Sequence, residues 1–175
     1  MSAQVGQSAR MLTPGVGWSL ASTVVLSTWL GAALFFSAVA APALFRVLPS
    51  RTLAGAVVGR TLPVLFVAGI VIGLLVALLT WPAAAPQRLR LAVSASAIAM
   101  ASLCAIAQFV IGARISRLRA SLQSTLEALP PNDPARLEFG RLHGYAVMSL
   151  GAAMLLAVFA VAALATHLAW AASTE

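Results

Sequence analysis

Two histidines, His143 and His167, are the side chains in this sequence best suited to ligate a haem iron. They lie 24 positions apart along one apolar segment. A helix rises 1.5 Å per residue, so this spacing corresponds to about 36 Å. One chain therefore cannot place both histidines on one metal. We expect no cofactor, and a membrane haem or redox protein is kept as an alternative function.

Sulfur-containing side chains offer a second possible metal site. Met100 and Cys104 are four positions apart on one helix face, and Met154 has a similar depth in the last apolar segment. Thioether and thiolate groups suit Cu(I), but methionine and cysteine are also ordinary core residues. We expect no metal site, with Met100, Cys104 and Met154 as the weak candidates. A small transporter or permeation pathway for a soft metal or solute is a further alternative.

Motifs of known catalytic chemistry are absent from the sequence. It contains no HExxH, P-loop, GxSxG or CxxC pattern. Hydrolase, nucleotide-binding and disulfide-exchange activities therefore have no support. We expect a protein that is not an enzyme.

The composition is that of an integral membrane protein. Hydrophobic residues make up 61% of the chain and charged residues 9%, against roughly a quarter charged in soluble domains. The net charge of +7 comes from eleven arginines, with no lysine. In so apolar a chain this surplus indicates contact with anionic lipid headgroups. Nucleic acid is not an expected partner, because aromatic residues do not alternate with the basic ones.

Four apolar segments are long enough to cross a bilayer, which takes about 20 helical residues. We expect an all-α membrane bundle, residues 18–170, between tails at 1–17 and 171–175, with spans at about 18–45, 62–80, 91–111 and 145–165. None of the four spans contains a charged side chain. Mechanisms that need an intramembrane acid are therefore disfavoured.

The first span carries a feature of secretory signals, the small residues Ala38 and Ala40 around Val39. However, the apolar core from Trp18 to Ser37 exceeds the usual 7–15 residues, and Arg46 and Arg51 follow it. We therefore expect a membrane span rather than a cleaved signal.

Arginine counts predict the orientation in the inner membrane. Eight of the eleven arginines lie in loops 46–60 and 112–142, and the other three lie in the N-terminal tail or between the second and third spans. Arginine-rich loops normally stay in the cytoplasm. We expect these two loops in the cytoplasm and both termini on the outer side.

The loop between the third and fourth spans has an amphipathic pattern. Its apolar residues recur at three- and four-residue intervals, at Ile115, Leu118, Leu122, Leu126 and Leu129. Prolines 130 and 131 should end this helix, and Asp133 should cap the next one. We expect a cytoplasmic amphipathic helix that either extends the third span or lies along the headgroups.

Small residues predict where helices pack closely. Gly69-x-x-x-Gly73 lies in the second span and Gly140-x-x-x-Gly144 at the entrance of the fourth, while alanines 97, 101 and 105 form a stripe in the third. A small face left over would allow a homo-oligomer or a membrane-protein partner. Glu138 is spaced to pair with Arg141.

Four sequence segments together resemble the transmembrane protein 205-like family, in particular its bacterial members, also described as domain of unknown function 4149. The segments are "WLGAALFFSAVAAPALFRVLP", "AGAVVGRTLPVLF", "AQFVIGARISRLR" and "FGRLHGYAVMSL". The resemblance implies a four-span helical membrane domain and no established enzymatic reaction. After His143-Gly144 the family favours serine and asparagine, and here this chain differs.

Residues carried over from the resemblance gather at the expected cytoplasmic surface. The motif positions it implies are Phe45, Arg46, Pro49, Gly55, Pro63, Arg114, Phe139, His143 and Gly144. With its neighbours this surface gives a cationic rim, defined as Arg46, Arg60, Arg114, Arg141 and His143. Such a rim can hold a phosphate or carboxylate group. Alternatively, these side chains reach ordinary headgroups and helix-end carbonyls.

Overall fold

Helices form nearly all of the described chain. A computed structural model describes residues 14–81, 85–122 and 128–173, and these residues contain no strand. Four helices are long and apolar enough to cross a membrane, namely Gly17–Val47, Arg51–Thr80, Gln87–Ser121 and Pro134–Ser173. Each helix contains one predicted span and extends beyond it. The predicted all-α, four-span membrane fold is therefore confirmed.

Two of the four helices contain a short π-helical segment. The elements in chain order are α2 (Pro14–Phe35), η1 (Phe36–Ala40), α3 (Ala41–Val47), α4 (Arg51–Thr80), α5 (Gln87–Ala105), η2 (Ile106–Gly112), α6 (Ala113–Ser121) and α7 (Pro134–Ser173). The π-helical segments η1 and η2 interrupt the first and third helices. Such single-turn segments bend helices and are frequent at functional sites.

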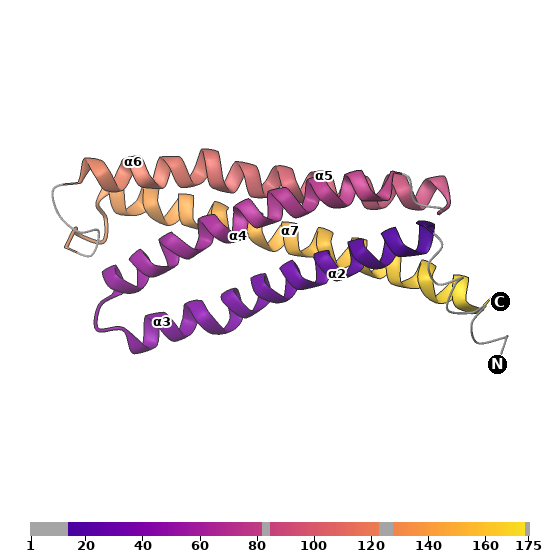
Figure 1. The fold of residues 1–175 in the computed structure, drawn as a ribbon. Coiled ribbons are helices and arrows are strands. Elements are labelled where there is room, and N and C mark those ends of the chain that lie inside the picture. The colour runs from indigo at the N-terminus through magenta and orange to yellow at the C-terminus, as the bar shows by residue number, and fades with distance from the viewer. Residues whose placement is uncertain (1–13, 82–84, 123–127, 174–175) are drawn as a thin grey trace.

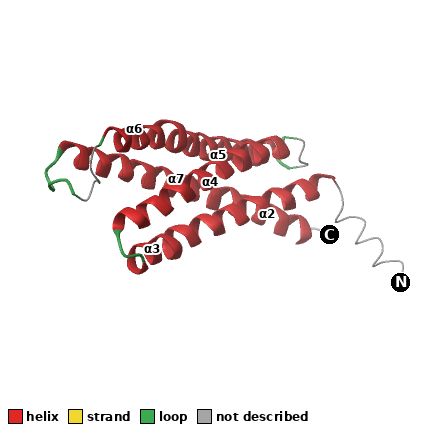
Figure 2. Ribbon diagram, turned by 60° about the vertical axis from the view of Figure 1, so that its left-hand side comes forward, coloured by secondary structure: helices red, strands yellow, loops and turns green. Residues whose placement is uncertain are grey.

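The helices run up and down around one axis, with loops only at the two ends (Figures 1 and 2). α4 packs on α2 and α5, and α7 packs on the same two helices, so the four form a closed ring. The α3–α4 and α6–α7 connections lie at one end, and α2 begins and α7 finishes at the other. We call the first of these the arginine-rich end, because α3, α6 and the starts of α4 and α7 carry most of the arginines.

The closest helix contact joins α4 to α5 at two glycines. A methyl group built on Gly73 would lie 2.6 Å from the carbonyl oxygen of Ala97 and 2.9 Å from the Cβ of Ala101. A methyl group on Gly69 would lie 2.7 Å from the Sγ of Cys104. All three distances are too short for a real side chain. The predicted close packing at Gly69-x-x-x-Gly73 is therefore confirmed, and α4 and α5 form the most extensive helix pair in the bundle.

Trp29 packs α2 against the α4–α5 contact at Gly69. Its indole is 2% exposed and also lies against Gly69. The Nε1–H group donates a 3.0 Å hydrogen bond to the carbonyl oxygen of Leu65 in α4. This contact explains why one tryptophan lies deep in the span, since a buried indole N–H needs an acceptor.

The second predicted close contact is wrong. A methyl group on Gly140 or Gly144 would meet nothing within 4 Å. The two glycines lie on a face of α7 that no described neighbouring helix covers. The spacing of small residues permits a close approach, but a partner helix must also lie opposite.

Polar side chains cap the N-termini of two helices, as their residue types predict. The Oγ of Ser50 accepts a hydrogen bond from the Leu53 N–H at the start of α4. The Oδ1 of Asp133 accepts one from the Ala135 N–H at the start of α7, so the predicted Asp133 cap is confirmed.

A separate amphipathic helix through Leu129 is not supported. The third helix continues as α6 only to Ser121, and Leu122 is extended, with φ −87° and ψ 133°. Residues 123–127, which include Leu126, lie outside the described part of the chain. Leu129 lies in a turn before Pro130 rather than in a helix. The regular spacing of leucines therefore does not correspond to one helix.

The helix pairs diverge toward the arginine-rich end, where α3–α4 separates from α6–α7 (Figure 1). α3 packs on α4 and η1, whereas α6 packs on α7 and η2. Pro63 lies within α4 and cannot donate a backbone hydrogen bond, and η2 faces this part of α4. Irregular backbone thus occurs where the tightly packed half of the bundle gives way to an open half.

The glycine contact gives a direct test of this packing. We expect Gly73→Ala to lower the free energy of unfolding by about 1–3 kcal/mol, because its methyl group overlaps backbone atoms of α5. SDS-induced unfolding of the purified protein, followed by circular dichroism, measures the change. The matched control is Gly31→Ala, whose methyl group would meet nothing within 4 Å. Equal effects of the two substitutions would contradict the close α4–α5 contact.

Candidate functional site

The diverging helices border a partly open cavity of about 320 Å³ near the arginine-rich end. One wall is α4 around Pro63, another is η2 with α6, and the third is α7 at His143 and Ala146. The polar side chains in the lining are Gln108, Ser116, Arg119 and His143. We call this space the Arg119 cavity. It is the meeting point of three helices that are far apart in sequence.

Arg119 reaches across from α6 to α4, where two glycines leave room for it. A methyl group built on Gly59 would lie 3.3 Å from Nη1 of Arg119, and one on Gly55 would lie 3.7 Å from Nη2. Side chains in a helix lean toward its N-terminus, and for α6 this direction leads back toward the bundle. The Arg119 side chain is exposed, and its guanidinium group lies beside α4.

An aromatic ring of α7 lies against the same guanidinium group, and a second ring stacks on the first. Its central carbon lies 5.1 Å from the centre of the Phe139 ring, a cation–π geometry. The Phe139 ring is in turn stacked on the His143 imidazole, with centroids 6.0 Å apart and planes 10° apart. The spacing of four residues places both rings on one face of α7. Arg119, Phe139 and His143 thus form a row from α6 to α7.

The charge of Arg119 has no carboxylate partner among the described residues. Neither Asp133 nor Glu138, the described acids in that part of the chain, forms an ion pair there. The predicted pair between Glu138 and Arg141 is therefore not formed. A guanidinium group beside a cavity, with no carboxylate paired to it in the described part of the chain, is suited to an anion, since its N–H groups can bind a phosphate or carboxylate in a bidentate manner.

Other polar groups of the cavity come from the irregular backbone. The carbonyl of Gly59 would normally bond to the N–H four residues later, but that residue is Pro63. Gln108 lies in η2, half-buried, and its amide forms no hydrogen bond within the described chain. The cavity therefore offers both hydrogen-bond donors and acceptors next to the arginine.

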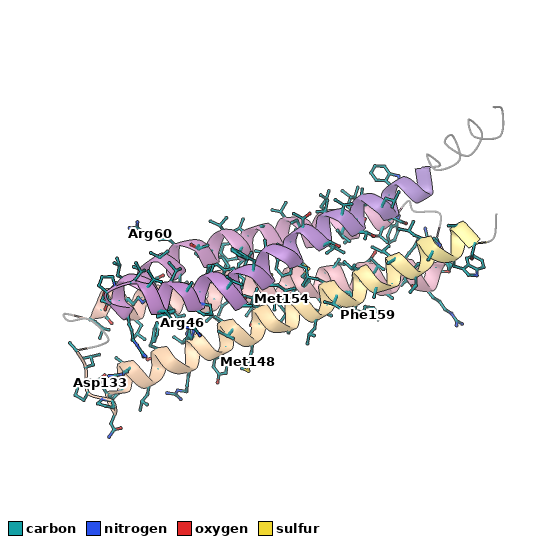
Figure 3. All side chains as sticks on the ribbon, turned by 90° about the horizontal axis from the view of Figure 1, so that it is seen from below. Arg46, Arg60, Asp133, Met148, Met154 and Phe159 are labelled. Carbon is teal, nitrogen blue, oxygen red and sulfur yellow. The ribbon has the colours of Figure 1, made fainter. Side chains whose placement is uncertain are left out.

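The structure does not bring the five residues of the cationic rim together. All five members are exposed, but only His143 lines the Arg119 cavity; the members that do not line it are Arg46, Arg60, Arg114 and Arg141. Figure 3 shows Arg46 on the side toward α7 and Arg60 at the opposite edge of the bundle. His143 is thus brought close to Arg119 rather than to the arginines named with it.

The motif positions also separate into two groups. Gly55 contacts Arg119, Pro63 lines the cavity and Phe139 carries the guanidinium group. The positions outside the cavity are Phe45 in α3, Pro49 before α4 and Gly144 on the uncovered face of α7. Gly55, Pro63 and Phe139 therefore connect the family motif to the Arg119 cavity.

The sulfur-containing residues are core residues in this structure. Met100 and Cys104 are both 0% exposed and belong to the main hydrophobic cluster, against which the partly buried Met154 packs. Within the described residues, no group of three or more His, Cys, Asp or Glu side chains is placed to hold a metal ion.

Sequence reasoning missed Arg119 as a site residue, although it counted this arginine toward orientation. Two signals point to it. Gly55 and Gly59 repeat the small-residue spacing at the start of α4, and Phe139 and His143 are spaced to share a helix face. Neither signal names the arginine that fits between them, because several arginines occur on α6.

These features define a multi-pass helical membrane protein with a cationic cavity at one end. Residues 24–124 match a family model described as a domain of unknown function (DUF4149), which covers more than half of the chain. The chain belongs to this family. The matched region contains Gly55, Pro63 and Arg119 but ends before α7. No curated protein and no solved structure matches the chain.

Thiol labelling tests the placement of the cavity. Cys104 is 0% exposed, so we expect wild-type protein in mild detergent to resist maleimide until it unfolds. Ser116 lines the cavity, and the variant Cys104→Ser/Ser116→Cys should react under the same conditions. Mass spectrometry counts the added labels. Rapid labelling of Cys104 in the folded protein would contradict the buried core described above.

Proposed function

We propose that this protein acts by binding an anionic group in the Arg119 cavity, as a lipid-contacting or accessory protein of the membrane, and not by catalysis. The observation that carries the proposal is the position of Arg119, which lies between two glycines and an aromatic ring without a carboxylate partner in the described chain. Phosphate and carboxylate are the groups that arginine binds best in a bidentate geometry.

The depth of the site supports a ligand at the membrane surface. Gly59 comes three residues before Leu62, where the apolar span of α4 begins. This is about 5 Å along the helix, within the headgroup layer that adds roughly 5–8 Å on each side of the hydrocarbon. A guanidinium group beside Gly59 is therefore at the height of lipid phosphates.

Two alternative functions have less support. Soft-metal transport would use Met100 and Cys104, but both side chains are packed in the core, and Cys104 lies against Gly69. A haem held by two histidines is disfavoured, because His143 and His167 are separated by 24 residues of the single helix α7.

A relationship to transmembrane protein 205-like proteins is part of the proposal. Its support comes from the sequence segments around Gly55, Pro63, Phe139 and His143, which include residues of the Arg119 cavity. On this view the proteins share an anion site at the membrane surface.

Lipid retention tests the anion site. We expect native mass spectrometry of delipidated protein to show preferential binding of phosphatidylglycerol over phosphatidylethanolamine. Arg119→Ala should weaken phosphatidylglycerol binding by about tenfold to hundredfold, the loss expected for a hydrogen-bonded charged group. Arg114→Ala is the matched control, since it removes the same charge from a position of α6 that does not line the cavity. Equal losses in both variants would show that Arg119 has no special role.

We also propose that the arginine-rich end faces the cytoplasm of a cell with this protein in its inner membrane. The support is the distribution of arginines, which favours retention of that end in the cytoplasm. A single cysteine in the variant Cys104→Ser/Ser121→Cys should then be protected from an impermeant maleimide in intact cells and react after lysis. Labelling in intact cells would establish the inverted orientation.

A further inference from the structure

A second hollow lies along the outer face of α4 and adjoins the Arg119 cavity at Pro63. Its lining is entirely apolar and consists of Pro63, Val64, Val67, Ala68, Val71 and Ile72. These residues repeat every four positions, so they form one stripe along a single helix. Pro63 belongs to both linings, so the two hollows adjoin at this residue. We call this stripe the α4 groove.

The two hollows have complementary chemistry. The cavity presents the Arg119 guanidinium group with Gln108 and His143, whereas the α4 groove presents only hydrocarbon. An anionic lipid has the same division, with a charged headgroup joined to an apolar chain. A free anion would use the cavity and leave the groove to unrelated hydrocarbon.

The length of the α4 groove fits one leaflet of a bilayer. The nine helical steps from Pro63 to Ile72 rise about 14 Å, close to half of the roughly 30 Å hydrocarbon thickness. Pro63 lies at the edge of the apolar span 62–80 and Ile72 lies near its middle. A chain placed in the groove would therefore run from the headgroup level to the centre of the membrane.

We propose that the ligand of the Arg119 cavity is a single anionic lipid whose headgroup binds Arg119 and whose acyl chain lies in the α4 groove. This inference rests on the proposed anion-binding function and adds the identity of the ligand. The headgroup gives selectivity for charge. The chain gives a contact that a free phosphate or carboxylate does not make.

Blocking the groove without changing the cavity tests the lipid inference separately from the proposed anion site. Val67 lies in the middle of the groove and is 43% exposed, so the indole of Val67→Trp would fill it. Leu78→Trp is the matched control, because Leu78 is an exposed residue of the same helix outside the groove. We expect Val67→Trp to weaken retention of dimyristoyl phosphatidylglycerol by about fivefold in native mass spectrometry, and Leu78→Trp to leave it unchanged.

A deacylated headgroup, glycerophosphoglycerol, provides the second arm of the experiment. It should bind at least about tenfold more weakly than the whole lipid and be insensitive to Val67→Trp. Equal binding of headgroup and lipid, or equal retention by the two tryptophan variants, would overturn the lipid inference while leaving the anion site in place. If Arg119→Ala binds both probes as the wild type does, the anion site itself is absent.

Discussion

The close approach of α4 to α5 at Gly69 and Gly73 is the contact on which the rest of the structure depends. Lipid chains are as apolar as the helices, so packing rather than hydrophobic burial must hold such a bundle together. The two glycines bring backbone against backbone, and a side chain at Gly73 would meet the Ala97 carbonyl oxygen. Trp29 adds α2 to this contact through its hydrogen bond to Leu65. One half of the bundle is thereby closely packed, and in the other half the helix pairs lie farther apart.

Irregular backbone explains both the separation of the helix pairs and the polar groups of the Arg119 cavity. Pro63 interrupts the hydrogen bonding of α4, and η2 interrupts the third helix beside it. Beyond this level the helix pairs separate, and the space between them becomes the Arg119 cavity. Helix defects are tolerated in a membrane where they border a cavity that other groups can satisfy. The same defects release the Gly59 carbonyl and position Gln108, so a loss of regular structure supplies polar groups to the site.

The sequence predicted the fold better than the site, and the reasons are physical. Runs of apolar residues without charge define four spans because no other structure can cross a bilayer in this way. In contrast, Gly69-x-x-x-Gly73 and Gly140-x-x-x-Gly144 have the same spacing, yet only the first pair meets a helix, because spacing carries no information about what lies opposite. Arg119 was overlooked for a similar reason. The arginines of α6 are alike in sequence, and only the three-dimensional arrangement shows which one fits beside the glycines of α4.

The central claim is that Arg119 binds the phosphate of an anionic lipid, and solid-state NMR measures this contact directly. Protein labelled with ¹⁵N-arginine in phosphatidylglycerol bilayers should show a dipolar coupling between a guanidinium nitrogen and lipid phosphorus, at a distance of about 4 Å or less. Arg119→Lys should remove this coupling, and Arg114→Lys should leave it. A spectrum that is unchanged by Arg119→Lys, or changed equally by both substitutions, would contradict the account.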